Sequence, residues 1–280
     1  MLLDPRVSTR APFLSFVICS RDDERFAGIQ REIRSKVVLV DCEIVRITDA
    51  TSLAEGYNRG YRETRGDWVI FCHDDIVFID ADTVLHLLRS FAQCDVLGLC
   101  GTSRLVSGNW YDAGPPFISG AVVAPSLAVA GAFELQIFDR RNPPLVTGAQ
   151  AVDGIFIAAR RKVLDCLQGF NERDFQDFVL YDVEFSFRAY LAGFQVAIAT
   201  DILVFHDSHV GGFSHEKLQR WEDAQRVFTG LYGSYLFPPS GLRHDLRVMT
   251  AATREEALAI YQSIPASAVA EQPAAAMQGQ

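Results

Sequence analysis

The run His73-Asp74-Asp75 is the first place where residue types and spacing could do chemistry. It directly follows Trp68–Cys72, a short apolar segment that predicts a buried strand. Ligands of open α/β sheets bind in the crevice outside the carboxyl ends of strands. Two adjacent carboxylates there repel each other unless a ligand compensates, and a divalent cation that bridges a diphosphate would do so. The alternative is an acidic turn that only caps the next element.

A second candidate is Asp182, in the segment 181–188. It is expected in the first turn of a helix, where the macrodipole favours the ionised carboxylate. A positioned carboxylate can act as general base toward a hydroxyl. The alternative is an acid that merely stabilises the helix terminus. Glu184, the fallback base, stands four residues before Arg188, so we expect these two side chains to pair along the helix.

His206 follows another apolar segment, 202–205, and a neutral imidazole at a strand end is a plausible metal ligand. A structural turn residue is the alternative. The nearby pair Gly211-Gly212 suits either a loop that closes over phosphate or an ordinary turn. Ser20 and Asp49 also follow apolar segments, where Asp49 could accept from a nucleobase N–H or a ribose hydroxyl, or could cap the next helix.

The first hundred residues alternate between two patterns. Apolar segments predict strands at 13–20, 68–72 and 96–100, with one or two more within 37–48; helical spacing and a Ser52–Glu55 capping box predict helices at 22–35, 52–64 and 82–93. This alternation predicts an α/β fold with a Rossmann-like, mostly parallel sheet and helices on both faces.

The remainder of the chain is less regular. Residues 101–150 are rich in Gly, Pro, Ser and Asn, which favours a binding surface with Trp110 and Tyr111 exposed. Order is expected to return in strands at 152–158, 195–199 and 202–205, and in helices from Arg160, at 181–191 before Gly193, and at 215–231. We therefore divide the chain into a donor half (1–100), an acceptor and catalytic half (101–235) and an extension (236–280), of which the last ~15 residues are predicted to be disordered.

Composition limits the possible functions. The 280 residues are 49% hydrophobic, enough for one large α/β domain or two tightly fused halves. A net charge of −9 argues against a broad nucleic-acid surface but permits a local phosphate pocket. Six cysteines without a CxxC pair indicate buried thiols in a reducing compartment. With no secretory signal and no apolar run of ~18 residues, we expect a cytoplasmic protein and leave contact with the inner face of a membrane open.

Several phosphate and nucleophile motifs are missing. The chain has no GxGxxG after its first expected strand, no GxxxxGK[ST] and no GxSxG. This argues against a dinucleotide-binding Rossmann domain, a P-loop ATPase and an α/β-hydrolase. Phosphate would therefore be held by a metal and by side chains, which gives the acidic run more weight.

The ordered segments over roughly residues 13–210 resemble the GT-A glycosyltransferases of family 2. That family has an Asn-x-Gly helix, a Gly-Asp turn, an apolar strand and a metal-binding DxD-type motif; the matching segments here are Asn58-Arg-Gly60, Gly66-Asp67, Trp68–Cys72 and His73-Asp74-Asp75. Residues 152–161, Gly169-Phe170 and 181–194 are similar to its acceptor half. Two positions depart from the pattern, because His73 replaces the first Asp, as in a bacterial HxD variant, and Tyr181 replaces the Glu of a Glu-Asp pair.

The resemblance implies an inverting, metal-dependent transfer of sugar from a nucleotide-sugar, with UDP-sugar as first choice, to a glycan or glycolipid hydroxyl in bacterial surface glycan synthesis. It implies Asp182 as base, and Asp75 with His206 as ligands of Mn²⁺ or Mg²⁺. The implied donor contacts are Ser20, Asn58, His73, Asp49 at the nucleobase and Asp74 at the ribose; the implied acceptor contacts are Trp110, Asp153, Gly154 and Glu184.

Two other classes stay open. A nucleotidyltransferase on a related fold would need a Gly-rich, basic first loop, whereas residues 19–23 contain one Arg and no Gly. A non-catalytic module of the same fold would bind nucleotide or sugar without transfer. Nucleotide titration with Mn²⁺ and a search for slow donor hydrolysis separate these alternatives.

Overall fold

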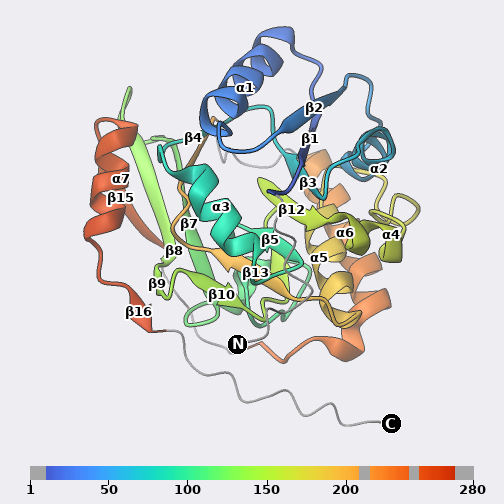
Figure 1. Ribbon diagram of the computed structural model, residues 1–280. Helices are drawn as coiled ribbons and strands as arrows, with labels where there is room; N and C mark the ends of the chain where they lie inside the picture. Colours follow the sequence, from blue (N-terminus) through green and yellow to red (C-terminus); the bar gives the residue numbers. More distant parts are fainter. Residues whose placement is uncertain (1–10, 208–214, 240–245, 269–280) are drawn as a thin grey trace, which may run out of the picture.

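A seven-stranded sheet runs through the centre of the computed structural model, which describes residues 11–207, 215–239 and 246–268 (Figure 1). Its strand order is β10-β13-β5-β12-β3-β1-β2. In chain order these strands are β1 (Leu14–Cys19), β2 (Cys42–Ile47), β3 (Trp68–Cys72), β5 (Val96–Gly98), β10 (Leu145–Thr147), β12 (Phe156–Arg160) and β13 (Val196–Ala199). β1 lies parallel to β2 and β3, and β13 parallel to β5, while β12 runs antiparallel between β3 and β5. The predicted α/β class is confirmed, with a sheet that is mixed.

Helices cover both faces of this sheet, as predicted. One face packs against α1 (Asp23–Lys36) and α3 (Thr83–Phe91), and the other against α2 (Leu53–Glu63), α4 (Arg161–Leu167) and α5 (Tyr181–Leu191). Side chains alternate along β3 accordingly: Ile70 belongs to the first core, and its neighbours Val69 and Phe71 belong to the second. A strand that is buried on both faces has apolar residues at successive positions. β3 is such a strand, and its sequence WVIFC is apolar throughout.

A second sheet lies beside the first and occupies the left of Figure 1 together with α7 (Arg254–Ser263). Its order is β11-β6-β7-β14-β4, and β8 extends it from β7 to β15. These strands are β4 (Ile76–Phe78), β6 (Cys100–Thr102), β7 (Ile118–Pro125), β8 (Phe133–Asp139), β11 (Ala151–Val152), β14 (Val204–His206) and β15 (Arg247–Ala251). Residues 101–150, expected as an irregular surface, therefore contain the long β7–β8 pair. Short elements complete the described chain: η1 (Trp110–Ala113), β9 (Arg141–Asn142), η2 (Gly233–Tyr235) and β16 (Ser267–Ala268).

Two of the expected strand segments differ from the structure. Of the one or two strands expected within 37–48, only β2 forms. Residues 37–40 form no strand, because the Val37 N–H still bonds to the Ile33 carbonyl at the end of α1, and Val38 and Leu39 are exposed. The expected strand 96–100 divides at Leu99: Gly98 pairs within the central sheet and Cys100 within the second. The break lets one chain segment join both sheets.

The predicted helix at 215–231 is confirmed as α6 (His215–Tyr232). The residues Gly211 and Gly212 and the tail from residue 269 onward lie outside the described residues. No helix among the described residues has both the length and the apolar character needed to cross a bilayer.

Glu184 joins α5 to α6 from inside the protein. Its side chain is 1% exposed and accepts from Arg188 Nε at 2.8 Å, so the predicted pairing of these two residues is confirmed. The Tyr232 hydroxyl donates to the same carboxylate at 2.7 Å. This corrects the expectation that Glu184 contacts an acceptor, because both partners hold the carboxylate within the core.

Replacing Glu184 should measure this connection. Glu184→Ala leaves the Arg188 guanidinium without its buried partner and should lower the free energy of unfolding by about 3–5 kcal/mol in urea denaturation. Tyr232→Phe, the matched control, removes one hydrogen bond and should cost only about 1–2 kcal/mol. A loss below about 1 kcal/mol in Glu184→Ala would contradict the buried ion pair.

Candidate active site

Strand pairing brings His206 to the acidic run. β3 ends at Cys72 and β4 begins at Ile76, so residues 73–75 form the connection between the two sheets. β14 pairs antiparallel with β4 and places His206 opposite Ile76. The Asp207 N–H also donates to the Asp75 carbonyl at 2.9 Å. Backbone hydrogen bonds thus fix the distance between two segments that are far apart in the sequence.

Three side-chain atoms meet at this point. His206 Nε2 lies 3.3 Å from Asp75 Oδ1, and His73 Nδ1 lies 3.2 Å from His206 Nε2 and 3.9 Å from Asp75 Oδ1. Asp75 Oδ1 is buried, and no described donor reaches it with hydrogen-bond geometry. Of the described residues, these three form a group that could hold a metal ion. A buried acceptor of this kind needs compensation, and a cation coordinated by carboxylate and imidazole would supply it.

Asp75 is the ionised member of the group. Burial raises the pKa of its carboxyl, but the contact with His206 and the charges of both histidines and Arg25 outweigh burial and hold the pKa below its usual value. Arg25 Nη1 lies 3.4 Å from Asp75 Oδ2 and 3.9 Å from Asp74 Oδ1. Arg25 was not among the expected site residues, although an arginine in the first turn of the helix after the first strand was an available signal.

Asp182 lies at the start of α5, facing the turn at residues 153–155. The Gly154 N–H donates to Asp182 Oδ2 at 2.7 Å. Burial, and then the negative charge of Asp153, raise the pKa of Asp182 to about 7. The helix terminus was expected to favour the ionised form, and backbone N–H groups do lower this pKa, but they are outweighed. Asp182 therefore exchanges a proton near neutral pH.

Gly154 is required where the turn meets α5. A Cβ at this position would overlap the Tyr181 hydroxyl and would lie 3.0 Å from Asp182 Oδ2. The Tyr181 hydroxyl is 3.3 Å from the Gly154 carbonyl and 3.2 Å from His73 Nε2. Tyr181 therefore connects the start of α5 to the group formed by His73, Asp75 and His206, which we call the histidine group. His73 and Tyr181, the two departures from the family pattern, contact each other.

Trp110 was expected to be exposed, and this is wrong. The side chain is 8% exposed and packs edge-on against Phe138, at 4.9 Å between ring centroids. Its indole N–H donates to Asp153 Oδ2 at 3.0 Å, while the Ile155 N–H donates to Oδ1 at 2.9 Å. Trp110 thus orients Asp153, the carboxylate that raises the pKa of Asp182.

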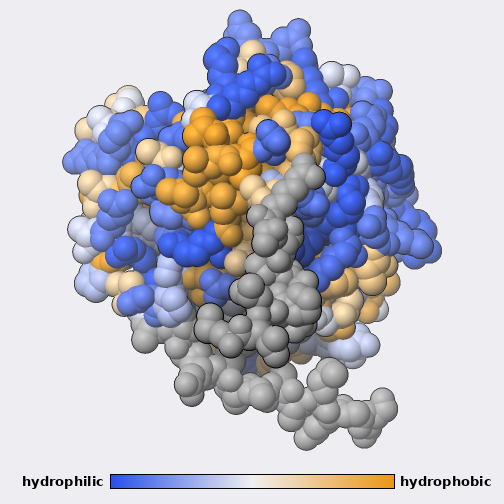
Figure 2. Space-filling view, in the orientation of Figure 1, coloured by the Kyte–Doolittle hydropathy of each residue, from blue (hydrophilic) through white to orange (hydrophobic). Residues whose placement is uncertain are grey.

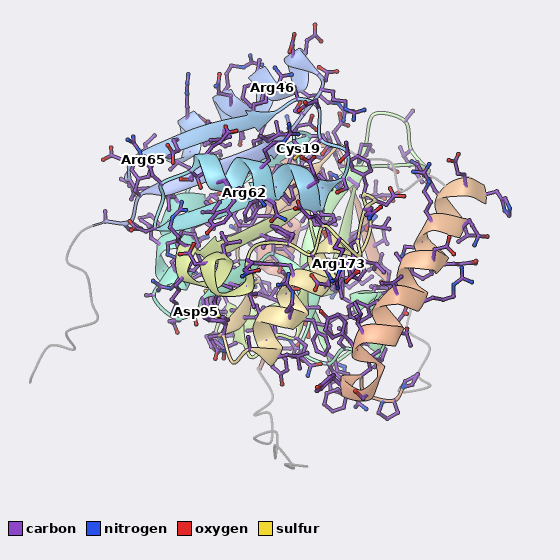
Figure 3. All side chains as sticks on the ribbon, turned by 90° about the vertical axis from the view of Figure 1, so that its right-hand side faces the viewer. Cys19, Arg46, Arg62, Arg65, Asp95 and Arg173 are labelled. Carbon is purple, nitrogen blue, oxygen red and sulfur yellow. The ribbon has the colours of Figure 1, made fainter. Side chains whose placement is uncertain are left out.

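Asn58 was expected to contact the donor, but it is 2% exposed and faces the interior. Its amide accepts from the Phe170 N–H at 2.7 Å and donates to the Phe170 carbonyl at 2.9 Å. Arg62, labelled in Figure 3 on the same helix, reaches Glu172 at 3.8 Å. Asn58 therefore attaches α2 to the loop before α5, which corrects its assignment.

Ser20 and Asp49 behave differently from each other. Ser20 is 4% exposed, and its hydroxyl donates to the Asp22 carbonyl at 3.0 Å in a local turn. The Asp49 side chain is 74% exposed and pairs with Arg59 Nη1 at 2.8 Å. Asp49 thus stays accessible to a ligand at the carboxyl end of β2.

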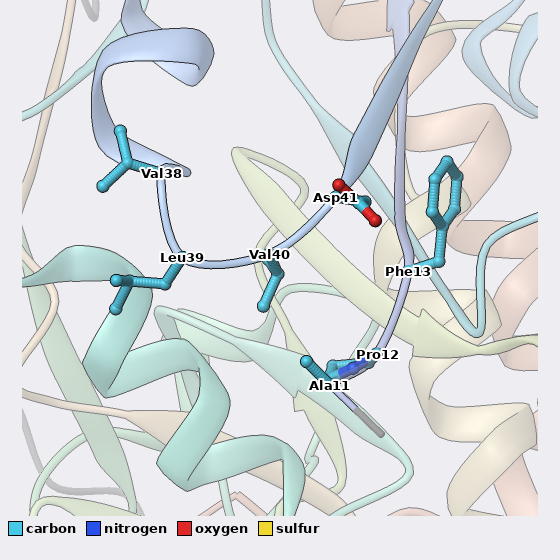
Figure 4. A pocket seen from close by; sticks show the side chains of 7 residues that line it. All are labelled: Ala11, Pro12, Phe13, Val38, Leu39, Val40 and Asp41. Atoms are coloured by element: carbon cyan, nitrogen blue, oxygen red, sulfur yellow. The ribbon is translucent and has the colours of Figure 1, made fainter.

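A separate pocket of about 290 Å³ opens at the amino ends of β1 and β2 (Figure 4). It is lined by the residues before β1 and before β2: Ala11, Pro12, Phe13, Val38, Leu39, Val40 and Asp41. Figure 2 shows that apolar side chains also gather in one area of the surface. Since β1 and β2 begin at the pocket and end near Ser20 and Asp49, it lies away from the histidine group.

One of the comparisons with known proteins identifies a family. The family model described as "Glycosyltransferase like family" matches residues 15–232. No curated protein sequence matches this chain. Among solved structures, the mannosyltransferase PcManGT from Pyrobaculum calidifontis in complex with GDP-Man and Mn²⁺ is 11% identical, with a TM-score of 0.47 over 73% of this chain and 59% of that chain.

Two further structures are similarly distant. A Drosophila beta-1,4-galactosyltransferase 7 mutant in complex with manganese, UDP-Gal and xylobiose is 13% identical, with a TM-score of 0.45 over 75% of this chain and 79% of that chain. GalNAc-T7 with UDP, GalNAc and Mn²⁺ is 14% identical, with a TM-score of 0.48 over 81% of this chain and 50% of that chain. The identification rests on the family match, which spans most of the chain and includes His73, Asp75, Asp182 and His206. The chain therefore belongs to the glycosyltransferase-like family.

Proposed function

We propose that this protein transfers a sugar from a nucleotide-sugar to an acceptor hydroxyl in a cation-dependent reaction that inverts the anomeric configuration. The observation that carries the proposal is Asp75 Oδ1, a buried and ionised acceptor without a hydrogen-bond donor among the described residues, 3.3 Å from His206 Nε2. Family membership supports the class of reaction. We extend the proposal to a glycan or glycolipid acceptor in bacterial surface glycan synthesis on the family resemblance alone.

Asp75 and His206 are the proposed ligands of Mn²⁺ or Mg²⁺. When bound, the cation neutralises the negative charge that builds up on the departing nucleoside diphosphate. We propose that Asp74 accepts from the ribose and that the exposed Asp49 accepts from the nucleobase, with a UDP-sugar as the first donor to test. Arg25 is half exposed beside both carboxylates and is a further candidate for the diphosphate.

Asp182 is the proposed general base. A carboxyl with a pKa of about 7 is half ionised at neutral pH and accepts a proton more readily than an ordinary aspartate. The Gly154 N–H fixes one of its oxygens, so its orientation is set before the acceptor arrives. A single base that activates the incoming hydroxyl implies direct displacement and hence inversion. Asp153 and Gly154, which border this carboxylate, are the proposed edge of the acceptor site.

Paired substitutions should separate the cation from the base. In thermal-shift measurements, Mn²⁺ together with a UDP-sugar should raise the melting temperature of the wild type more than the UDP-sugar alone, because ligands of the folded state stabilise it. Asp75→Asn should lose this metal-dependent rise. Asp182→Asn should keep it but release UDP from the donor about 10²–10⁴ times more slowly, the usual contribution of a general base.

Asp41→Asn changes an exposed carboxylate directly before β2, at the amino end of that strand, and serves as the control. GDP- and dTDP-sugars belong in the same panel. A donor shift that survives Asp75→Asn unchanged would rule out the proposed cation ligand. Near wild-type UDP release by Asp182→Asn would rule out the proposed base, and release of pyrophosphate from a nucleoside triphosphate would indicate a nucleotidyltransferase.

The rate should depend on pH through Asp182. UDP release should rise as pH increases through about 7, because the base acts only after losing its proton. Asp153→Asn should move this rise to lower pH, since it removes a negative charge that raises the pKa of Asp182. The pH profiles of both proteins, measured at saturating Mn²⁺, test this. An identical profile in Asp153→Asn would contradict the coupling.

A further inference from the structure

We propose that His73 is a third protein ligand of the cation, through Nδ1, and that Tyr181 positions it for this role by accepting a hydrogen bond from Nε2. The resulting set of two imidazoles and one carboxylate would select Mn²⁺ over Mg²⁺. This inference rests on the proposed cation-dependent function and adds to its ligand set.

The direction of the hydrogen bonds follows from the Tyr181 hydroxyl. It lies 3.3 Å from the Gly154 carbonyl and 3.2 Å from His73 Nε2. A carbonyl oxygen only accepts, whereas an imidazole nitrogen either donates or accepts, and the hydroxyl has a single proton. Both contacts form when the hydroxyl donates to Gly154 and accepts from a protonated Nε2. The reverse direction would leave the carbonyl contact without a proton.

A neutral imidazole with its proton on Nε2 has a bare Nδ1. This nitrogen faces Asp75 Oδ1 at 3.9 Å and His206 Nε2 at 3.2 Å. Together with the 3.3 Å between Asp75 and His206, these distances define a circle through the three atoms with a radius of about 2.0 Å, which is close to the ~2.0–2.2 Å bonds that Zn²⁺ forms with imidazole and carboxylate. The three atoms are therefore close enough together for one divalent cation to contact all of them.

The ligand types decide which cation fits. Mg²⁺ takes oxygen ligands in octahedral geometry and dehydrates reluctantly, whereas imidazole binds first-row transition ions. With His206 as the single nitrogen ligand, Mn²⁺ and Mg²⁺ remain close alternatives. A second nitrogen from His73 shifts the preference toward Mn²⁺.

Packing holds the Tyr181 hydroxyl in place. The side chain is 4% exposed, and its ring lies edge-on to Tyr57 with 5.8 Å between centroids. The turn at Gly154 leaves no room for a Cβ beside the hydroxyl. Tyr181→Phe therefore removes one hydroxyl and keeps the ring. Tyr57→Phe is a matched control, because the Tyr57 hydroxyl is also buried but has no hydrogen-bond partner among the described residues.

Binding of Mn²⁺ alone, followed by electron paramagnetic resonance without nucleotide, tests the ligand set. The Kd for Mn²⁺ should rise about 10–100-fold in Tyr181→Phe, as for other residues that orient a metal-bound histidine, and at least as much in His73→Gln. Tyr57→Phe should bind as the wild type does. Mg²⁺ should displace Mn²⁺ from His73→Gln at lower concentrations than from the wild type.

Nitrogen-15 NMR of the metal-free wild type tests the role of Tyr181 directly. The chemical shifts of His73 should show a protonated Nε2 and a bare Nδ1, and Tyr181→Phe should lose this single tautomer. A proton on Nδ1 in the wild type would overturn the inference, and this measurement decides even if Tyr181→Phe fails to fold.

The outcomes also distinguish this inference from the proposed function. If Asp75→Asn abolishes Mn²⁺ binding while Tyr181→Phe and His73→Gln bind normally, the cation site stands and the role of His73 is wrong. If the wild type binds no Mn²⁺, the cation-dependent function and this inference fail together.

Discussion

A buried carboxylate oxygen without a donor among the described residues, Asp75 Oδ1, is the constraint on which the arrangement of the site depends. Such an atom is costly to bury unless a positive partner compensates it. The pairing of β4 with β14 brings His206 to this oxygen, and the end of β3 brings His73. The second sheet therefore does more than enlarge the core, because its ladder sets the spacing of side chains that would hold a cation.

Two aspartates near this point have opposite protonation behaviour. Contacts with histidine and arginine lower the pKa of Asp75, whereas burial and a neighbouring carboxylate raise the pKa of Asp182. Environments that separate the pKa values of two carboxylates are typical of sites where one group carries charge and the other carries a proton. Tyr181 lies between these environments, since its hydroxyl contacts His73 on one side and Gly154 on the other.

Four side chains with expected ligand contacts have protein partners in the structure. The family resemblance implied ligand contacts for the polar groups of Asn58, Ser20, Glu184 and Trp110. In the structure Asn58 bonds to the Phe170 backbone, and Ser20 bonds to the Asp22 carbonyl. Glu184 bonds to Arg188 and Tyr232, and Trp110 bonds to Asp153. Buried polar groups generally have hydrogen-bond partners. Whether such a group faces a ligand or a protein partner depends on segments far away in the chain.

The amino-acid sequence by itself determined the elements and one edge of the site. Apolar runs and helical spacing are local, so they predicted β1, β3, α2 and α5, and they located residues 73–75 at the carboxyl end of a buried strand. Tertiary structure decided which side chains meet there. The contact of Tyr181 with His73, the antiparallel place of β12 and the raised pKa of Asp182 arise from packing and desolvation between distant segments. Local sequence patterns record neither the distance between such segments nor the loss of water around them.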